Sequence, residues 1–338
     1  FDVAIIDEAS QALEAQLLPI LMHVPKFILI GDPRQLPAIV VQPENETAVH
    51  DEALREIGIT NLRQSYFERL LARLMQLGRT DCYCLLRHQG RMHEELMQFP
   101  NTAYYESQLT PAEFEDTFKR QTAPFFMPAN PNGTPWLAHR LAFVHCAPPE
   151  VEATTALQGS KACPWEIDPL LQSINGILKY YLEQWKADGG EDTAAFLKDF
   201  TQHKLGIITP YRDQIAQIQA RLHQLSEQYS LPQIAEIVVD TVERYQGSQR
   251  DHILVSFSTK TTWRLDTLSV AEASPRWLAP QHTPLLVDRK LNVLLTRAKE
   301  QLILFGNRDL LQTAAAYQPL LEHIDGLGHS YSQDFNEI

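Results

Sequence analysis

Two polar clusters near the start of the chain carry the residue types of a phosphoryl-transfer site. Asp7 and Glu8 follow the apolar run at residues 3–6, and Gln35 comes shortly after the apolar run at 27–30. An aspartate at the end of a strand can hold Mg2+, usually through water, and an adjacent glutamate can activate a water that attacks a γ-phosphate. The amide of Gln35 has a donor and an acceptor, so it can contact both that phosphate and that water.

Short apolar runs predict the strands that would position these residues. The runs are 3–6, 27–30, 141–144, 205–208, 253–257 and 302–305. Continuous apolar runs are typical of strands that are covered on both faces of a parallel sheet. Apolar residues recur at helical spacing between the runs, over 64–77, 173–185 and 214–229. This alternation predicts an α/β fold with parallel sheets, whose ligand crevice lies at the carboxyl ends of the strands.

Length and charge exclude several classes of protein. The chain has 338 residues, which predicts about two domains, and a net charge of −13, which excludes a basic coat protein or a histone-like binder. No apolar run approaches the roughly 18 to 20 residues that a membrane helix needs. The chain begins at Phe1 inside an apolar run, so we interpret it as a fragment in which no signal peptide can be identified.

The cysteines and histidines predict no structural metal. None of the four cysteines, at positions 82, 84, 146 and 163, is spaced as in a zinc knuckle, and the twelve histidines lack an HExxH pattern. Cys82 and Cys84 are two positions apart on an expected strand, so their side chains would point to the same face. We therefore predict buried thiols in a reducing cytoplasm.

One proline-rich stretch interrupts the regular pattern. Ten of the 21 prolines fall within residues 100–169, which predicts an irregular insertion there. A second such stretch covers 263–284.

Six motifs, in chain order, resemble those of superfamily 1 helicases. They are DEAS (7–10, motif II), GDPRQLP (31–37, motif III), QGRMH (89–93, the QxRMH motif), GIITPY (206–211, motif IV), DTVERYQG (240–247, motif V) and LNVLLTRAK (291–299, motif VI). The QGRMH motif resembles that of the branch containing the nonsense-mediated-decay helicase and the Okazaki-fragment helicase-nuclease. Each motif alone would be a hypothesis, but six in order over nearly the whole chain are specific.

The resemblance implies two RecA-like (P-loop NTPase) domains with ATP in the cleft between them. Asp7 would serve Mg2+, Glu8 would activate water, and Gln35 would sense the γ-phosphate. Arg91 and Arg297 would act from the second domain as arginine fingers, because a guanidinium is permanently charged and forks onto phosphate oxygens.

The resemblance also implies contacts made by the second domain alone. Gly247 and Gln249 would contact the nucleotide, and Thr209, Thr241 and Gln246 would contact the nucleic-acid strand without reading its sequence. Family members often have an acidic residue where this chain has Gln249, so the ribose contact expected there is altered.

The distribution of charge allows a nucleic-acid partner despite the net charge. Residues 241–300 carry nine basic and six acidic side chains, a net charge of +3, which leaves −16 for the rest of the chain. A translocating enzyme needs a local basic track rather than a basic body. The competing interpretation is that these charged side chains only form a solvent-exposed face and bind no nucleic acid. Tyr245, Trp263 and Trp277 could stack bases, although packing in the core is the favoured interpretation.

The phosphate-binding loop GxxxxGK[ST] (Walker A) is absent from these residues. None of the 14 glycines is followed by lysine, and the resemblance places this loop upstream of Phe1. We therefore predict that this chain by itself hydrolyses ATP poorly or not at all.

The motifs predict two domains of unequal size. Residues 1–90 would be the carboxyl-terminal part of a first, incomplete RecA-like domain, with apolar strand faces left uncovered. Residues 91–338 would form the second domain, with the proline-rich insertion around 100–169.

The leading functional hypothesis is an ATP-dependent helicase or translocase that uses Mg2+. The resemblance implies 5′ to 3′ movement on single-stranded nucleic acid, with DNA favoured over RNA, in the cytoplasm (at the nucleoid in a bacterium). One alternative is a helicase-like scaffold that binds nucleic acid or a partner without turnover. Another is a helicase fused to an upstream nuclease or other domain.

Overall fold

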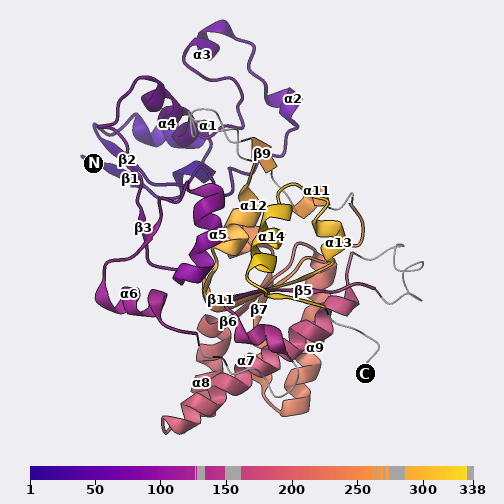
Figure 1. The fold of residues 1–338 in the computed structure, drawn as a ribbon. Coiled ribbons are helices and arrows are strands. Elements are labelled where there is room, and N and C mark those ends of the chain that lie inside the picture. The colour runs from indigo at the N-terminus through magenta and orange to yellow at the C-terminus, as the bar shows by residue number, and fades with distance from the viewer. Residues whose placement is uncertain are drawn as a thin grey trace. The chain divides into compact units, whose positions relative to one another are not determined.

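A computed structural model describes residues 1–125, 127, 134–148, 161–262, 265–268, 271–273 and 286–332. The chain forms two compact units (Figure 1). The first unit comprises Phe1–Leu86 and Ala271–Asn292, and the second comprises Arg87–Val270 and Val293–Ile338. Among the described residues, no helix has the length and apolar character that crossing a membrane requires.

The first unit is built on two short parallel strands. Strand β1 pairs with β2 in the register Ala4 to Phe27, Ile5 to Ile28 and Ile6 to Leu29. The elements of this unit are β1 (Ala4–Ile6), η1 (Ala9–Gln11), α1 (Glu14–Leu21), β2 (Phe27–Leu29), α2 (Glu44–Thr47), α3 (Glu52–Glu56), α4 (Tyr66–Gln76), β9 (Ala271–Ala273), β10 (Leu286–Asp288) and the start of α12 (Arg289–Leu295). Helix α4 begins where the Ser65 hydroxyl accepts a hydrogen bond from the Glu68 N–H.

An ion pair attaches the later segment of this unit to α4. Arg289 Nη2 lies 2.9 Å from Glu68 Oε1, and both side chains are almost fully buried. Pairing matters here because a lone charge at such depth is strongly destabilising.

The apolar runs of β1 and β2 are more exposed than continuous runs usually are. Ile5 is 66% exposed and Ile28 is 52% exposed. The expectation that these strands are covered on both faces is therefore wrong for this pair. The exposure agrees instead with the expectation of uncovered apolar faces in the first domain.

The second unit is organised around a six-stranded sheet with the order β12-β5-β11-β8-β6-β7. Every neighbouring pair in this sheet is parallel. Its strands are β5 (Leu141–His145), β6 (Leu205–Ile208), β7 (Val238–Asp240), β8 (Arg250–Ser256), β11 (Ala298–Gly306) and β12 (Ser330–Ser332). A separate short parallel pair is formed by β3 (His88–Gln89) and β4 (Thr110–Pro111).

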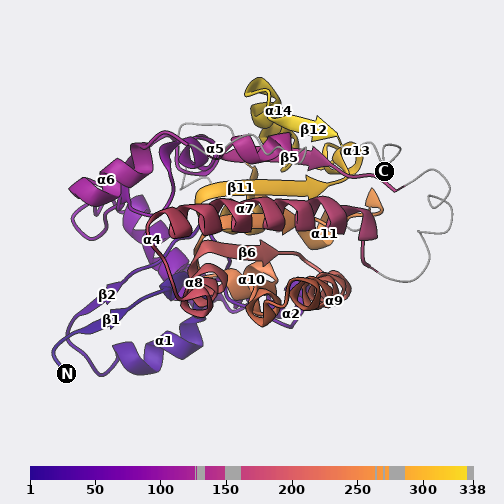
Figure 2. The ribbon, with the colours of Figure 1, turned by 90° about the horizontal axis from the view of Figure 1, so that it is seen from below.

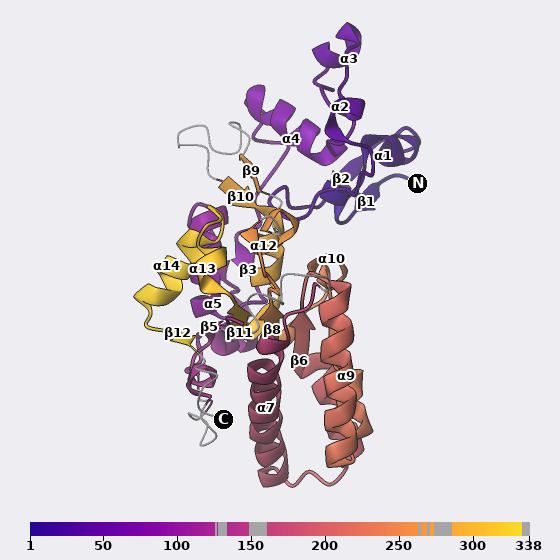
Figure 3. The ribbon, with the colours of Figure 1, turned by 90° about the vertical axis from the view of Figure 1, so that its right-hand side faces the viewer.

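Helices cover both faces of the six-stranded sheet. The helical elements of this unit are α5 (Glu94–Tyr104), α6 (Glu115–Thr122), η2 (Pro135–Ala138), η3 (Pro164–Glu166), α7 (Ile167–Ala187), α8 (Thr193–Asp199), η4 (Phe200–Lys204), α9 (Arg212–Tyr229), η5 (Pro232–Glu236), α10 (Val242–Tyr245), α11 (Leu265–Leu268), α13 (Arg308–Leu311) and α14 (Gln318–Gly326). Helices α7 and α9 pack on one face, where they share a single buried apolar cluster with the strands (Figures 2 and 3). Helices α5 and α14 contact β11 and β5 but contribute nothing to that cluster, which places them on the other face.

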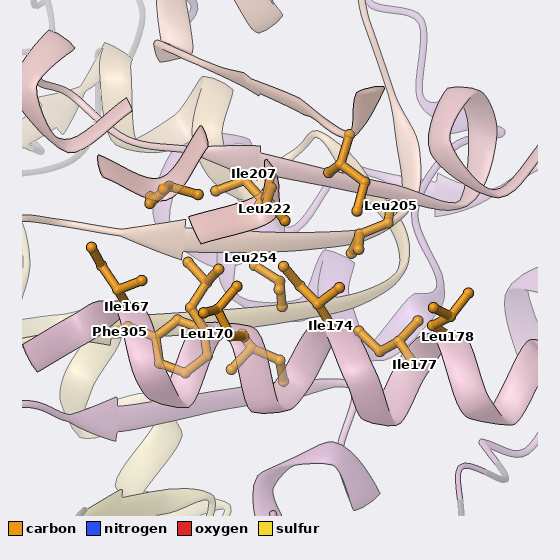
Figure 4. Packing of buried hydrophobic residues seen from close by; sticks show 14 of the residues in the cluster. Ile167, Leu170, Ile174, Ile177, Leu178, Leu205, Ile207, Leu222, Leu254 and Phe305 are labelled. Carbon is orange, nitrogen blue, oxygen red and sulfur yellow. The ribbon is translucent and has the colours of Figure 1, made fainter. Parts of the chain in front are cut away.

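The strand register explains why this cluster is continuous. Ile207, Leu254 and Ile303 are paired across three neighbouring strands and therefore point to the same face. On α7, Leu170 and Ile174 are four residues apart, so they lie on one side of the helix and face the strands in Figure 4. Fully buried aliphatic side chains of this kind each stabilise the fold by about 1.5–3 kcal/mol.

A glycine allows one close approach in the sheet. A Cβ on Gly206 would lie 2.3 Å from the hydroxyl oxygen of Tyr245. Tyr245 is 2% exposed and donates a hydrogen bond to the Val238 carbonyl at 3.0 Å. Tyr245 is thus a core residue, and burial raises its pKa to about 12. Trp263 and Trp277, the other two possible stacking residues, lie outside the described residues.

The sequence predicted the fold class and the main elements correctly. The α/β class is confirmed, and the six-stranded sheet and the β1–β2 and β3–β4 pairs are parallel, whereas β9 and β10 pair antiparallel. Each of the six apolar runs forms a strand. The three predicted helices correspond to α4, α7 and α9.

The structure differs from two expectations drawn from the sequence. Cys82 and Cys84 are exposed and lie in no strand, and within the described ranges no strand pairs with that segment. Residues 100–169 include β5, which lies between β12 and β11 in the six-stranded sheet, and the start of α7. The described part of this stretch therefore contributes to the core as well as to loops.

Candidate functional site

In the first unit, the two predicted phosphoryl-transfer clusters share one edge of a sheet. Asp7 follows β1 and Gly31 comes soon after β2, and these strands are parallel neighbours. The Ala9 N–H donates to the Ile30 carbonyl at 2.8 Å, which joins the two loops. A Cβ on Gly31 would lie 2.9 Å from the backbone nitrogen of Ser10, so a glycine permits this approach.

Glu8 adopts a backbone conformation that few non-glycine residues use. Its φ is 52°, in the left-handed region. The Glu8 N–H donates to Asp7 Oδ1 at 2.9 Å, and Glu8 Oε2 accepts from Gln11 Nε2 at 2.7 Å. Strained conformations of this kind cluster at functional sites. Both carboxylates are exposed and therefore accessible to a ligand.

The donor set at Asp7 fits Mg2+ bound together with a nucleotide. Within the described ranges, no group of three or more His, Cys, Asp or Glu side chains could hold a metal ion by itself. Mg2+ is commonly bound by one or two carboxylates, with waters and phosphate oxygens completing its coordination. A single exposed aspartate at this edge is sufficient for that arrangement.

Gln35 is held by a residue that the sequence analysis did not single out. Its Nε2 donates to Asp32 Oδ2 at 2.9 Å, and Asp32 Oδ1 accepts from the Arg34 N–H at 2.9 Å. Asn292 Nδ2 donates to the Arg34 carbonyl at 2.8 Å. Asp32 precedes proline in a turn, a pattern that favours such side-chain-to-backbone bonds and could have identified it.

In the second unit, the structure brings three predicted nucleotide-site residues together. Arg91 Nε donates to Gln249 Oε1 at 2.9 Å, and Arg91 Nη1 donates to the Thr296 carbonyl at 3.1 Å. Gln249 immediately precedes β8, and Arg297 immediately precedes β11, the neighbouring parallel strand. The backbones meet there because the Arg250 N–H donates to the Arg297 carbonyl at 3.2 Å.

The Arg297 side chain lies inside the protein. It is 1% exposed, its Nε donates to the Val293 carbonyl at 2.9 Å, and its Nη2 donates to Thr296 Oγ1 at 3.0 Å. In this conformation its guanidinium is not exposed to solvent. Gly247 is exposed and has a φ of 80°, which glycine adopts without strain.

Two of the three predicted nucleic-acid residues lie at the opposite edge of the same sheet. Thr209 follows β6, is fully buried, and donates its N–H to the Asp240 carbonyl at 3.1 Å. Thr241 follows β7, and its N–H donates to Asp240 Oδ1 at 2.8 Å. Gln246 follows α10 and is half-buried, with an Nε2 that has no hydrogen-bond partner among the described residues.

The sheet therefore separates the predicted contacts into two groups. Gln249 and Arg297 lie at the amino ends of β8 and β11, whereas Thr209 and Thr241 lie at the carboxyl ends of β6 and β7. Strand β8 has seven residues. At about 3.3 Å per residue, the two edges are about 20 Å apart.

The carboxyl edge also holds two lysines that the sequence analysis did not propose as contacts. Lys161 Nζ lies 5.3 Å from the centre of the Tyr211 ring, and Lys260 Nζ lies 5.3 Å from the Trp165 ring. Ser258 Oγ donates to the Lys161 carbonyl at 2.6 Å, which joins the two segments. Cation–π contacts of this kind stabilise the positions of the two lysine ammonium groups. Lys161 lies in no motif, so only the tertiary structure identifies it.

A buried carboxyl group lies beneath this edge. Glu166 is fully buried, and its Oε2 accepts hydrogen bonds from Ser256 Oγ at 2.5 Å and from the Ser258 N–H at 2.9 Å. Burial raises the pKa of Glu166 to about 8, although these bonds and one from Cys163 favour the charged form. The side chain is therefore mostly neutral at pH 7.

Comparisons with known proteins agree with the motifs. A family model described as an AAA domain matches residues 62–309, and a second model with the same description matches residues 1–43. An uncharacterized ATP-dependent helicase of Methanocaldococcus jannaschii is 26% identical over 95% of this chain. Regulator of nonsense transcripts 1 of Dictyostelium discoideum is 27% identical over 96% of the chain. The DNA replication ATP-dependent helicase/nuclease DNA2 of Bos taurus is 26% identical over 96%.

These relatives are much longer than the region they share with this chain. The chain spans 38% of the Methanocaldococcus protein, 20% of the Dictyostelium protein and 26% of the bovine protein.

Proposed function

Because the chain belongs to the superfamily 1 helicases, with AAA domain matches that cover most of its length, we propose that it drives an ATP-dependent helicase or translocase. The proposed substrate is single-stranded DNA, along which the enzyme moves 5′ to 3′. The observation that carries the proposal is the meeting of Arg91, Gln249 and the Thr296 carbonyl at one edge of a parallel sheet. A surface ion pair, the ordinary use of an arginine, would not bring these motif residues together.

The proposed hydrolysis uses carboxylates from the first unit. Asp7 would hold Mg2+ with water and phosphate oxygens, and that ion would neutralise charge on the phosphates. Glu8 would accept a proton from the attacking water. Gln35 would orient that water and contact the γ-phosphate, and the Asp32 carboxylate holds the Gln35 amide ready for this role.

The second unit would contribute charge and nucleotide contacts to the same ATP, in the cleft that the family places between its two domains. Arg91 and Arg297 would stabilise the charge that develops on the transferred phosphoryl group. Gly247 would let the backbone approach the nucleotide, and the Gln249 amide would contact the ribose.

Two of the proposed nucleic-acid contacts lie at the carboxyl ends of β6 and β7, and the third follows α10, the helix that comes after β7. Thr209, Thr241 and Gln246 would hold the strand through its phosphates, without reading sequence. Thr209 is buried in the present conformation, so its side chain would need a local movement to do so. Lys161 and Lys260 would add positive charge beside them.

The preference for DNA rests on the resemblance of the QGRMH and RYQG motifs to those of DNA-processing relatives. The names of the relatives include both a regulator of nonsense transcripts and a DNA replication helicase, so they support neither substrate over the other. Unwinding assays on matched DNA and RNA duplexes, with 5′ or 3′ tails, test both the substrate and the direction. Faster unwinding of RNA, or of 3′-tailed duplexes, would reject this part of the proposal.

The decisive test of catalysis is Glu8→Gln in the natural protein that carries these residues. A lost general base costs about 10²- to 10⁴-fold in turnover, so we expect kcat for nucleic-acid-stimulated ATP hydrolysis to fall by at least about 100-fold. Glu227→Gln, on the exposed surface of α9, is the matched control and should retain activity. Unchanged turnover in Glu8→Gln would favour the alternative, a scaffold that binds nucleic acid or a partner without catalysis.

We further propose that the 338 residues by themselves hydrolyse ATP poorly. They contain no Gly-Lys step, and the backbone amides and lysine of a phosphate-binding loop are the main holders of the β- and γ-phosphates in this fold. Strong ATPase activity of the isolated chain, stimulated by nucleic acid, would contradict this.

A further inference from the structure

The turn that carries Arg91 is held by two adjacent side chains of helix α6. Arg120 Nη2 donates to the carbonyls of Gly90 at 2.7 Å and of Arg91 at 2.8 Å. Gln121 Nε2 donates to the carbonyls of Gln89 at 2.8 Å and of Met92 at 2.7 Å. Four consecutive backbone carbonyls are therefore bound by neighbouring residues of one helix.

The second terminal nitrogen of Arg120 is fixed as well. Its Nη1 donates to Glu300 Oε1 at 2.8 Å, and Glu300 Oε2 accepts from Arg140 Nη1 at 2.8 Å. Arg140 is 2% exposed, so this network is anchored in the interior. Glu300 belongs to β11, the strand that directly follows Arg297. Arg120 thus connects the Arg91 turn to the strand that begins directly after Arg297, the second predicted arginine finger.

Gln121 is fully buried, and its amide is satisfied on both sides. Its Oε1 accepts a hydrogen bond from the Ala112 N–H at 2.9 Å, while its Nε2 binds the turn. The amides of Arg91 and Met92 donate to Gln89 Oε1 at 3.0 and 2.8 Å. All four carbonyls of the turn and the N–H groups of Arg91 and Met92 are therefore hydrogen-bonded, which restricts the backbone of the turn.

We propose that Arg120 and Gln121 are positioning residues that fix the backbone of the 89–92 turn, so that the Arg91 guanidinium is presented at the amino edge of the sheet. The inference rests on the proposed function only for its catalytic consequence, because the contacts themselves are a property of the fold. A preorganised arginine needs no ordering during the reaction, and a misplacement of 1 Å can cost about 100-fold in rate.

The first test measures the turn itself and requires no activity. Hydrogen exchange of the Arg91 and Met92 amides is compared between the 338-residue chain and its Arg120→Ala variant. Loss of the clamp should make these amides exchange about 10-fold faster or more, while the amides of β8 and β11 stay protected. Lys119→Ala is the matched control, because Lys119 is the preceding residue on α6 and its ion pair is with the exposed Glu115 of the same helix. Unchanged exchange in Arg120→Ala would overturn the proposal.

The second test measures turnover in the natural protein that carries the chain. We expect Arg120→Ala to lower kcat for ATP by about 10- to 100-fold with little change in KM. Arg120→Lys should recover only part of this loss, because a single ammonium nitrogen lacks the planar fork with which Nη1 and Nη2 reach separate acceptors. In an Arg91→Ala background, the same Arg120→Ala change should have almost no further effect.

The outcomes separate this inference from the proposed function. If the wild-type protein turns over ATP and Arg120→Ala is as active, the positioning role is wrong and the proposed function stands. If the losses from Arg91→Ala and Arg120→Ala multiply, Arg120 acts elsewhere and the inference is also wrong. If the wild-type protein shows no turnover but exchange in the turn rises, the clamp is real and the proposed function fails.

Discussion

Replacement of Glu166 by glutamine should remove a specific pH dependence from the stability of the second unit. The glutamate is fully buried and has a pKa raised to about 8 by burial, against an ordinary value near 4.5. Between these two values the folded state keeps a proton that the unfolded state releases. The contribution of Glu166 to stability is therefore largest below about pH 4.5 and is lost as the pH rises toward 8.

The size of the effect follows from the two pKa values. Each pH unit in this window costs about 1.4 kcal/mol, so the wild-type chain should lose about 2.5 kcal/mol between pH 5 and pH 7 through this group alone. A glutamine resembles the protonated acid and cannot ionise. Glu166→Gln should therefore gain about 2.5 kcal/mol relative to the wild type over the same interval.

The assay is urea unfolding of both chains at pH 5, 6 and 7, followed by tryptophan fluorescence. Taking the difference between the chains at each pH cancels other titrating groups. One of these is the buried His252, whose lowered pKa, caused by burial, acts in the opposite direction. A difference in stability that changes by less than about 0.5 kcal/mol between pH 5 and pH 7 would refute the reasoning.

Two further changes test the sheet and its carboxyl edge. Gly206→Ala should destabilise the second unit by about 1–3 kcal/mol in urea unfolding, because the new Cβ would lie 2.3 Å from the buried Tyr245 hydroxyl oxygen; wild-type stability would show that the ring moves freely. Lys161→Ala and Lys260→Ala should each lower the slope of log affinity for single-stranded DNA against log salt by about 0.7. In the same fluorescence anisotropy titrations, Lys179→Ala, on α7, should leave the slope unchanged, and an equal change in all three variants would argue against a specific edge contact.

Periodicity predicted the local elements because each depends on residues close in the sequence. The run at 302–305 became the centre of β11, and the helical pattern at 173–185 became part of α7. The same rule failed at Cys82 and Cys84, where alternation alone does not supply a neighbouring strand. Burial of β1 was also overestimated, since coverage depends on what packs against a strand and not on its composition.

Motif order identified candidate site residues but not their arrangement. Arg91 and Gln249 are 158 positions apart, and only the sheet brings their side chains to 2.9 Å. Arg120 and Gln121 lie in a stretch that prolines made look irregular, and no motif marks them. Their role depends on which carbonyls they reach, which is a property of the tertiary fold alone. The boundary predicted at residue 90 rests on motifs that follow one another along the chain. The first compact unit also includes Ala271–Asn292, a segment distant in sequence that motif order does not identify.

The strand order has a consequence for how the second unit is made. Strand β5 (Leu141–His145) lies between β11 and β12 in the sheet, and both of these strands come later in the sequence. During synthesis, β5 can therefore pair only after Ala298–Gly306, and later Ser330–Ser332, have been made. At roughly 5–20 residues per second, the first of these partners leaves the ribosome about 8–30 s after β5 does. Through that interval, a strand that is almost fully buried in the finished sheet has no neighbour on either side. Newly made chains therefore pass through a period of exposure to aggregation that ends only when the last strand joins the sheet.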